Sequence, residues 1–213
     1  YLDCVSGACV YDLKEKKTLY SQALDPGIVK KLMEFGMEEG AMIHVLSERS
    51  IVQKDQQSHM ADFHMGIYQT MFDQITDKLE NIYNSFCEEP FPVLKLNLYH
   101  RDEASRARTV ERIKAAGLET ALALAESTSL ECSAKGIDKG VGLKKLCEHL
   151  GLPLEQTIAV GDADNDTMAL KTAGLAVAMG NATEPIKALA DVIVADCDHN
   201  GCAEAIDKYL LAD

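Results

Sequence analysis

Apolar residues from position 134 onward come in short runs that alternate with stretches of helical periodicity. Short apolar runs without alternation are typical of strands buried on both faces. Strands and helices that follow one another in this way predict a parallel sheet in a doubly wound α/β domain. The expected strands are residues 157–160, 175–179 and 192–194, and the expected helices are residues 139–150, 182–190 and 202–211, with a further helix that begins after Asp164.

The middle of the chain follows a different pattern. Residues 67–86 keep the helical period throughout and predict one long amphipathic helix. Residues 93–99 alternate, with leucines on one face and Lys95 and Asn97 on the other, which predicts a half-exposed antiparallel strand. Further helices are expected at residues 26–38, with Asp25 as N-cap, and at 104–116, and further strands at 41–46, 50–53 and 119–125, the first two as a hairpin.

This change of pattern predicts two domains. Residues 20–126 are expected to form an inserted α+β domain, a sheet with helices on one side. Residues 1–19 and 127–213 are expected to belong to the α/β domain, with residues 126–128 as the return into it. The predicted fold class is therefore α/β, a doubly wound parallel sheet that carries an inserted α+β domain.

Composition narrows the function. The chain has 213 residues, of which 47% are hydrophobic and 26% charged, so it can bury a sizeable core. Its formal net charge of −13 argues against a nucleic-acid partner, and no apolar stretch is long enough to span a membrane. The basic run of Arg101, Arg106, Arg108 and Arg112 is interleaved with acidic residues and is interpreted as a solvated helix face.

Cysteine usage predicts a compartment. The seven cysteines include no Cys-x-x-Cys pair, which is typical of free thiols in a reducing cytosol, so a cytoplasmic location is expected. No secretory signal opens the chain. Cys197, His199 and Cys202 match no common zinc-ligand spacing and are not interpreted as a metal site.

The clearest candidate for chemistry is a Gly-Asp-Ala-Asp-Asn-Asp turn at residues 161–166, directly after an expected buried strand. Ligands of open parallel sheets bind beyond the carboxyl ends of the strands. Three carboxylates this close together repel one another, and their hard oxygen atoms suit Mg²⁺. A calcium-binding EF-hand is excluded because Thr167 and Ala173 stand where its Gly and Glu are needed. A solvated acidic turn that caps the next helix remains the alternative.

A second motif lies upstream, where Lys139-Gly140 opens an amphipathic helix. A lysine at a helix N-terminus opposes the helix dipole, which favours a functional reason for its position. The order of these two motifs resembles the third and fourth motifs of the haloacid dehalogenase superfamily, and more narrowly the Cof-type sugar-phosphate phosphatases with an inserted α/β cap. The resemblance covers residues 1–12 and 130–211, and Ser6 takes the place of the family's Asn.

The resemblance implies a Mg²⁺-dependent phosphatase that acts on small phosphorylated metabolites, such as sugar phosphates, through an aspartyl-phosphate. Asp162 would coordinate Mg²⁺, and Asp166, also counted with the metal site, would hold a metal-bound water or the Lys139 ammonium. Lys139 would neutralise charge between phosphate and nucleophile, and Asn165 would donate a hydrogen bond to the phosphate. The expected catalytic residues are thus Lys139, Asp162 and Asp166, and the expected substrate-binding residues are Lys139 and Asn165.

Other polar residues are assigned structural roles. Asp138 and Asp164 are interpreted as helix caps and Lys135 as a solvated loop residue. Four further side chains of the inserted domain could touch a substrate but are interpreted as surface residues: His44, Arg49, His59 and His64.

The family's nucleophile belongs to an Asp-x-Asp-Gly-Thr motif that does not occur in this chain. Because that motif lies on the central strand of the family's sheet, we expect about 40 to 50 residues to precede Tyr1 in the natural protein, and the chain alone to be inactive. Two alternatives stay open: a non-catalytic relative that binds a phosphorylated ligand or Mg²⁺, and a phosphomutase of the same superfamily. The oligomeric state is not predicted.

Overall fold

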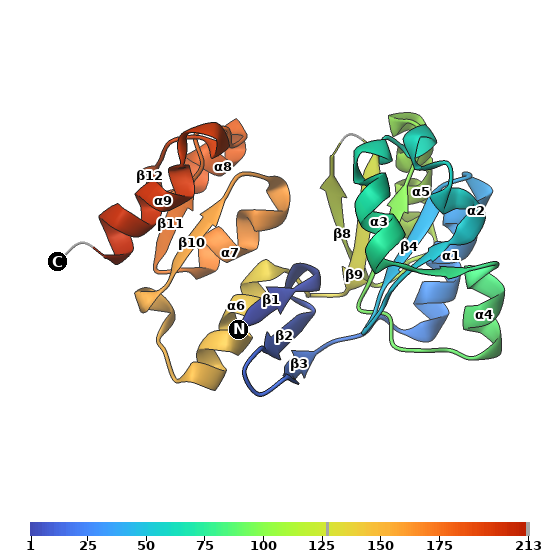
Figure 1. Ribbon diagram of the computed structural model, residues 1–213, viewed down its shortest axis with the longest axis horizontal. Helices are drawn as coiled ribbons and strands as arrows, with labels where there is room; N and C mark the ends of the chain where they lie inside the picture. The colour runs from blue at the N-terminus through green and yellow to red at the C-terminus, as the bar shows by residue number, and fades with distance from the viewer. Residues whose placement is uncertain (127, 212–213) are drawn as a thin grey trace. The chain divides into compact units, whose positions relative to one another are not determined.

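The computed structural model describes residues 1–126 and 128–211 and shows two compact units (Figure 1). The α/β unit comprises Tyr1–Ser21 and Ile137–Asp213, and the inserted unit comprises Gln22–Gly136. The predicted start of the insertion is close to the observed one, but its predicted end at residue 126 is wrong. The reason is that Ser129–Ala134 forms a strand of the inserted unit's sheet. Ser127, part of the expected return, lies outside the described residues.

A parallel sheet forms the larger part of the α/β unit, as predicted. Its strands pair in the order β10-β11-β12. Ala176 and Ala178 face a core cluster with α7 and α8, whereas Val177 faces one with α9, so helices cover both faces. The elements are α6 (Lys139–Leu150), η4 (Leu154–Gln156), β10 (Ile158–Gly161), η5 (Asp164–Asp166), α7 (Thr167–Thr172), β11 (Leu175–Ala178), α8 (Glu184–Leu189), β12 (Val192–Ile193), η6 (Cys197–His199), α9 (Gly201–Ala205) and a π-helical turn η7 (Ile206–Leu210).

Strand β10 differs from the prediction in one respect. In the described residues it pairs with β11 on one side only, and the side chain of Val160 is exposed. The expectation of a strand buried on both faces is therefore wrong for β10. Gly161 and Ala178 are register partners at the ends of β10 and β11, so the loops that follow the two strands begin at the same edge of the sheet.

The N-terminal segment of the α/β unit is an antiparallel meander of β1 (Leu2–Cys4), β2 (Cys9–Asp12) and β3 (Lys17–Ser21), with the short 3-10 turn η1 (Val5–Gly7) after β1. Helix α6 packs against β1, η1 and β2. At Gly7, φ is +89°, and a Cβ atom would lie 1.9 Å from the carbonyl oxygen of Asp138. Only glycine fits this close approach, which brings η1 against the start of α6.

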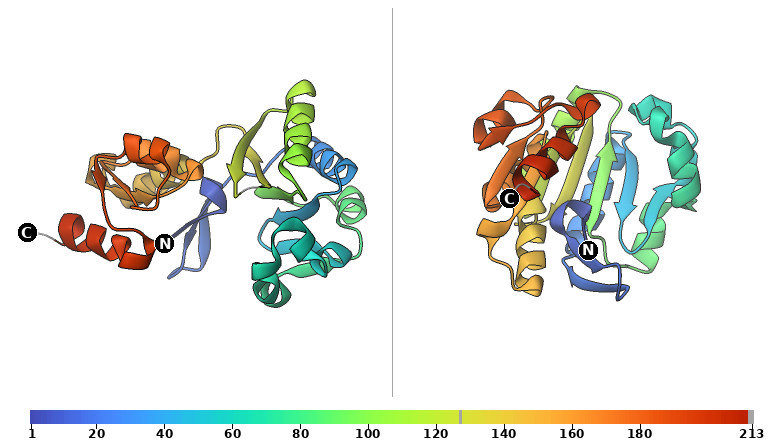
Figure 2. Two further views of the ribbon diagram at one scale, coloured as in Figure 1. Left: turned by 90° about the horizontal axis from the view of Figure 1, so that it is seen from above. Right: turned by 60° about the vertical axis from the view of Figure 1, so that its left-hand side comes forward.

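The inserted unit is built on a six-stranded sheet of order β6-β5-β4-β7-β9-β8. Its main core lies between one face of the sheet and helices α1, α4 and α5. A second core lies on the other face, under the segment from α2 to α3 (Figure 2). The elements are α1 (Pro26–Glu38), β4 (Met42–Leu46), β5 (Ser50–Gln53), α2 (Lys54–Gln57), η2 (Met60–Phe63), η3 (Gly66–Tyr68), α3 (Gln69–Ile75), β6 (Asp77–Leu79), α4 (Ile82–Glu88), β7 (Lys95–Tyr99), α5 (Glu103–Ala115), β8 (Thr120–Ala125) and β9 (Ser129–Ala134).

Two predictions for this unit are wrong for a common reason. The single helix expected at residues 67–86 is divided into η3, α3, β6 and α4. Phe72 packs into the second core, whereas Ile82 and Phe86 pack into the main core, so the chain must cross from one face of the sheet to the other. It crosses as β6, which pairs with β5. Helical segments therefore cover both faces of the sheet and not one.

Strand β7 is central, and all five of its residues are buried, so the expected half-exposed strand is also wrong. Its polar side chains have partners inside the unit, although Asn97 Oδ1 is buried and accepts no hydrogen bond. Lys95 Nζ lies 2.9 Å from Glu131 Oε2, and Asn97 Nδ2 donates to the Tyr99 hydroxyl at 3.1 Å. The same face carries Tyr99 into the second core, so an alternating pattern here marks a polar interior and not solvent.

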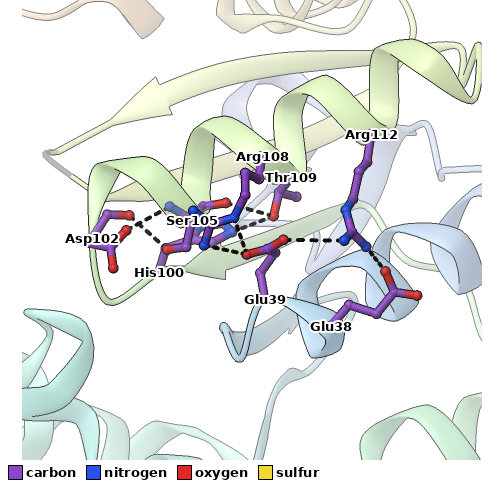
Figure 3. A network of polar contacts seen from close by, with 8 residues as sticks. All are labelled: Glu38, Glu39, His100, Asp102, Ser105, Arg108, Thr109 and Arg112. Atoms are coloured by element: carbon purple, nitrogen blue, oxygen red, sulfur yellow. Dashed lines mark hydrogen bonds and ion pairs between the residues drawn. The ribbon is translucent and has the colours of Figure 1, made fainter.

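The basic run on α5 serves the fold (Figure 3). Arg108 contacts Glu39 at 2.7 Å, and Arg112 pairs with both Glu38 and Glu39 at the end of α1. These pairs hold α1 against α5. Arg101, which precedes α5, pairs with Asp62, and Arg106 donates to the carbonyl oxygen of Glu126. Beneath them, the fully buried His100 lies 2.9 Å from the Thr109 hydroxyl.

Candidate functional site

Helix α6 begins where the sequence predicts it. Asp138 is its N-cap and accepts hydrogen bonds from the backbone amides of Gly140 and Val141, and Gly151 ends it in the left-handed conformation. This start directs Lys139 toward the acidic turn, where its Nζ lies 2.6 Å from Asp166 Oδ1. Two residues that are far apart in the chain thus meet in one ion pair.

Asp166 also shapes the turn itself. Its second oxygen, Oδ2, accepts from the backbone amides of Asp162 at 2.9 Å and Ala163 at 3.2 Å. Burial raises the pKa of Asp166, but the hydrogen bonds from Lys139 and the two amides outweigh it, and the net pKa lies below its usual range. Asp166 is therefore an anion that fixes both the turn and the Lys139 ammonium. A Cβ atom on Gly161 would lie 2.5 Å from that of Asp166, so glycine is needed there.

Asp162, the first acidic residue of this turn, is exposed. Asn181, which follows β11, donates from Nδ2 to Asp162 Oδ2 at 3.1 Å. Asn181 is itself held, because its Oδ1 accepts from the backbone amide of Cys197 at 3.0 Å. Asn181 was given no role from the sequence. Its position directly after the neighbouring strand, at the same edge of the sheet, could have indicated a role at the site.

The carboxylates of Asp162 and Asp166 fit Mg²⁺ better than a metal that takes three or more protein ligands. In residues 1–126 and 128–211, no three His, Cys, Asp or Glu side chains gather closely enough to hold a metal ion. Mg²⁺ keeps several waters and uses only one or two carboxylates. Asp162 offers an exposed carboxylate, and Asp166 lies beside it, although both of its oxygens are engaged by Lys139 and the turn.

The structure agrees with some of the roles predicted for the other residues near the site and not with others. Asn165 lies on η5, half-buried, next to Asp166. Asp138 is a helix cap as predicted, but Asp164 is not, because Ala163 occupies the N-cap position of η5 and Asp164 is its first residue. Lys135 is exposed and pairs with Glu119, as expected of a solvated loop residue.

Asp3 is a neighbour of the site that the sequence did not indicate. It lies on β1, and a Cβ atom on Gly142 of α6 would come within 2.2 Å of its Oδ1. Burial raises the pKa of Asp3 to about 6, and the charge of Lys139 opposes this rise. Asp3 therefore adds a titratable carboxyl beside the first turns of α6.

In the inserted unit, the interpretation of His44 as a surface residue is wrong. His44 is buried, with Nδ1 3.2 Å from the Tyr99 hydroxyl and Nε2 2.8 Å from Ser50 Oγ. His59 and His64 are exposed as predicted, and the exposed Arg49 pairs with Asp77. His44 shares a face of β4 with Met42, which packs into the second core, so the segment that covers this face also buries His44.

His44 leads to a testable pH dependence. Burial and the charge of Lys95 lower the pKa of His44 to about 4. The imidazole binds a proton more tightly in the unfolded chain than in the folded one. The contribution of neutral His44 to the free energy of unfolding is therefore complete above pH ~6.5 and is lost as pH falls toward 4. Between pH 7 and 5 we expect about 2 kcal/mol less stability from this group, measured by chemical unfolding followed by tyrosine fluorescence.

The control is a second histidine. His44→Gln is expected to flatten the pH dependence, whereas His59→Gln, at an exposed position, is expected to leave it unchanged. Equal slopes in the wild-type protein and His44→Gln would contradict this account of the buried imidazole.

Comparison with known proteins identifies the family. The family model of haloacid dehalogenase-like hydrolases matches residues 1–206. Phosphatase YwpJ of Bacillus subtilis is 46% identical over 83 residues, which cover 39% of this chain and 29% of that protein. The 5-amino-6-(5-phospho-D-ribitylamino)uracil phosphatase YcsE of Bacillus subtilis is 36% identical over 118 residues, which cover 55% of this chain and 47% of that protein. This chain therefore belongs to the haloacid dehalogenase-like hydrolases.

A solved structure supports the fold. The subclass IIB sugar phosphatase BT4131 superposes with a TM-score of 0.78 at 21% identity, covering 97% of this chain and 74% of that one. The fold of that phosphatase therefore matches both units of this chain. The matches to YwpJ and YcsE span less than half the length of either protein. In the described residues no helix is long and apolar enough to cross a membrane.

Proposed function

We propose that this chain is part of a Mg²⁺-dependent phosphatase that hydrolyses phosphomonoesters of small metabolites, with sugar phosphates as the first class to test. The observation that carries the proposal is the 2.6 Å contact between Lys139 and Asp166 beside the exposed carboxylate of Asp162. A fixed ammonium and a cation-binding carboxylate at the carboxyl end of a parallel sheet suit a transferring phosphoryl group.

Each residue has a distinct task in this proposal. Asp162, oriented by Asn181, holds the metal, which when bound neutralises charge on the phosphate oxygens. Lys139 presents its ammonium to the phosphate while Asp166 prevents it from swinging away. Asn165 donates a hydrogen bond to a phosphate oxygen. Because these groups are positioned before substrate arrives, little reorganisation is needed when charge develops in the transition state.

The aspartyl-phosphate step remains a prediction from the family resemblance, since the 213 residues contain no Asp-x-Asp-Gly-Thr motif. The relatives named above act as phosphatases, which supports a phosphomonoester as substrate but does not choose among metabolites. The net charge of −13 supports a small molecule and not a nucleic acid as partner. The seven free thiols support the predicted cytoplasmic location.

The test is metal dependence of the protein expressed from its complete reading frame. With p-nitrophenyl phosphate as substrate, EDTA is expected to lower kcat/KM at least about 100-fold, and excess Mg²⁺ to restore it. Restoration by Mg²⁺ controls for damage by the chelator. Full activity in EDTA, or no hydrolysis of aryl and sugar phosphates in Mg²⁺, would contradict the proposal.

A further inference from the structure

Two cysteines face each other across the first strand pair of the α/β unit. Cys4 on β1 and Cys9 on β2 are register partners in an antiparallel ladder. Directly opposed residues in such a ladder have Cα atoms about 4.5 to 5.5 Å apart, within the range that disulfides span. Cys4 is among the groups that raise the pKa of Cys9, and both thiols are free and half-exposed. A small reagent can therefore reach two thiols that lie opposite each other in the ladder.

The loop between the two cysteines has an unusual backbone. Val5, Ser6 and Gly7 all have positive φ angles, of 56°, 55° and 89°. This region is rarely occupied by residues other than glycine, and least of all by a β-branched one such as Val5. Such a conformation persists only when its surroundings hold it in place. Here the surroundings are the carbonyl group of Asp138, which Gly7 touches, and helix α6.

The loop in turn supports the start of α6. Gly7 packs against the backbone at Asp138 and Lys139, the residues at which the helix begins. A link between Cys4 and Cys9 would close a small ring around this loop, and would therefore hold the support of the Lys139 helix in a single conformation. No other two cysteines in residues 1–126 and 128–211 are register partners in a strand pair.

We propose that Cys4 and Cys9 form a redox modification site, which reacts with a small-molecule disulfide of the glutathione class and closes into a cross-strand disulfide that locks the Val5–Gly7 turn against α6. Disulfides of cytosolic proteins are usually transient and redox-sensing, so this site is compatible with the predicted compartment. The proposal does not depend on the phosphatase activity.

The chemistry is a two-step exchange. The Cys4 thiolate attacks one sulfur of oxidised glutathione, forms a mixed disulfide and releases one glutathione thiolate. Cys9 then gives up its proton, attacks the Cys4 sulfur, forms the Cys4–Cys9 bond and releases the second glutathione. The protein loses two electrons and two protons, and oxidised glutathione is reduced to two thiols. Burial, the neighbouring Cys4 and the charge of Asp3 raise the pKa of Cys9 to about 11, which assigns it the second step.

The test is a redox titration of the protein expressed from its complete reading frame. Samples in glutathione buffers from reducing to oxidising are alkylated and digested with trypsin. No lysine or arginine separates Cys4 from Cys9, so both lie in the peptide that ends at Lys14. The expected result is a peptide that is lighter by two hydrogens and carries no alkyl group. Two results would overturn the proposal. One is glutathione that stays attached to this peptide; the other is alkylation of both Cys4 and Cys9 under conditions in which the exposed Cys87 and Cys197 carry glutathione.

Two variants and a second measurement complete the test. Cys9→Ser is expected to stop at a mixed disulfide of Cys4 with glutathione, whereas Cys197→Ser is expected to behave like the wild-type protein. Hydrogen exchange at the amides of Gly140 to Leu143 is expected to slow on oxidation of the wild-type protein but not of Cys9→Ser. Unchanged exchange in the oxidised wild-type protein would overturn the locking of the turn. Neither readout measures phosphate hydrolysis, so this test and that of the proposed function fail separately.

Discussion

Asp162→Ala is expected to lower kcat/KM for p-nitrophenyl phosphate at least about 100-fold in the protein expressed from its complete reading frame, a loss of about 2.7 kcal/mol of transition-state stabilisation. Asp162 supplies the exposed carboxylate at the end of β10, and Asn181 orients it. The fold of the turn should survive the change, because Asp166 holds residue 162 through its backbone amide and not through its side chain. Steady-state kinetics at saturating Mg²⁺ make the measurement.

The matched control is Asp164→Ala. It removes the same charge from an exposed side chain in the same turn, at a position with no task in the proposed mechanism. We expect a change of less than about 3-fold, as for a surface charge that only adds to the general field. Equal losses in the two variants would mean that the turn acts through its net charge, and no loss in Asp162→Ala would remove Asp162 from the site.

Gly7→Ala is expected to destabilise the α/β unit by roughly 3 kcal/mol or more. A left-handed backbone costs a residue with a Cβ atom about 1 to 2 kcal/mol, and overpacking adds about 1 to 3 kcal/mol. The overpacking arises because the new methyl group would lie 1.9 Å from the carbonyl oxygen of Asp138, so η1 and the start of α6 must move apart. Chemical unfolding gives the free energy, and hydrogen exchange at the start of α6 shows where protection is lost.

Gly151→Ala separates the two costs. Gly151 also has a positive φ, of 66°, but nothing lies within 4 Å of the position that a Cβ atom would take. This variant should lose only the backbone cost, about 1 to 2 kcal/mol. If Gly7→Ala and Gly151→Ala lost the same free energy, the close approach of η1 to α6 would not be a tight contact in solution.

Local signals predicted most of the α/β unit. The N-cap Asp138, the apolar stripe of the following helix and the stop at Gly151 define α6 within the chain segment itself. Short apolar runs mark β10, β11 and β12 in the same way, although the side chains of Val160 in β10 and Ile193 in β12 are exposed. The family resemblance came from the two motifs that these elements carry, and the match of the family model to residues 1–206 confirms it.

The inserted unit was harder to predict, because its chain serves two cores. Helical periodicity at residues 67–86 is real, but Phe72 and Phe86 belong to opposite faces of the sheet. The polar residues of β7 follow the period of an exposed strand, and Lys95 and Asn97 are buried all the same. A single sequence records which residues are polar and at what spacing, but not which segment will later cover them.

By itself, the sequence determined the order of strands and helices in the α/β unit, the acidic turn after β10, the lysine that opens α6 and the family to which these belong. These follow from periodicity, capping and motif spacing, which act over a few residues. The tertiary structure alone decided that Asn181 orients Asp162, that Asp3 lies against α6 and that Cys4 and Cys9 face each other beside it. It also pairs Lys139 with Asp166, which the family resemblance gave as one of two roles for Asp166. Such contacts depend on which elements pack together, and packing is settled by the whole fold and not by any one segment.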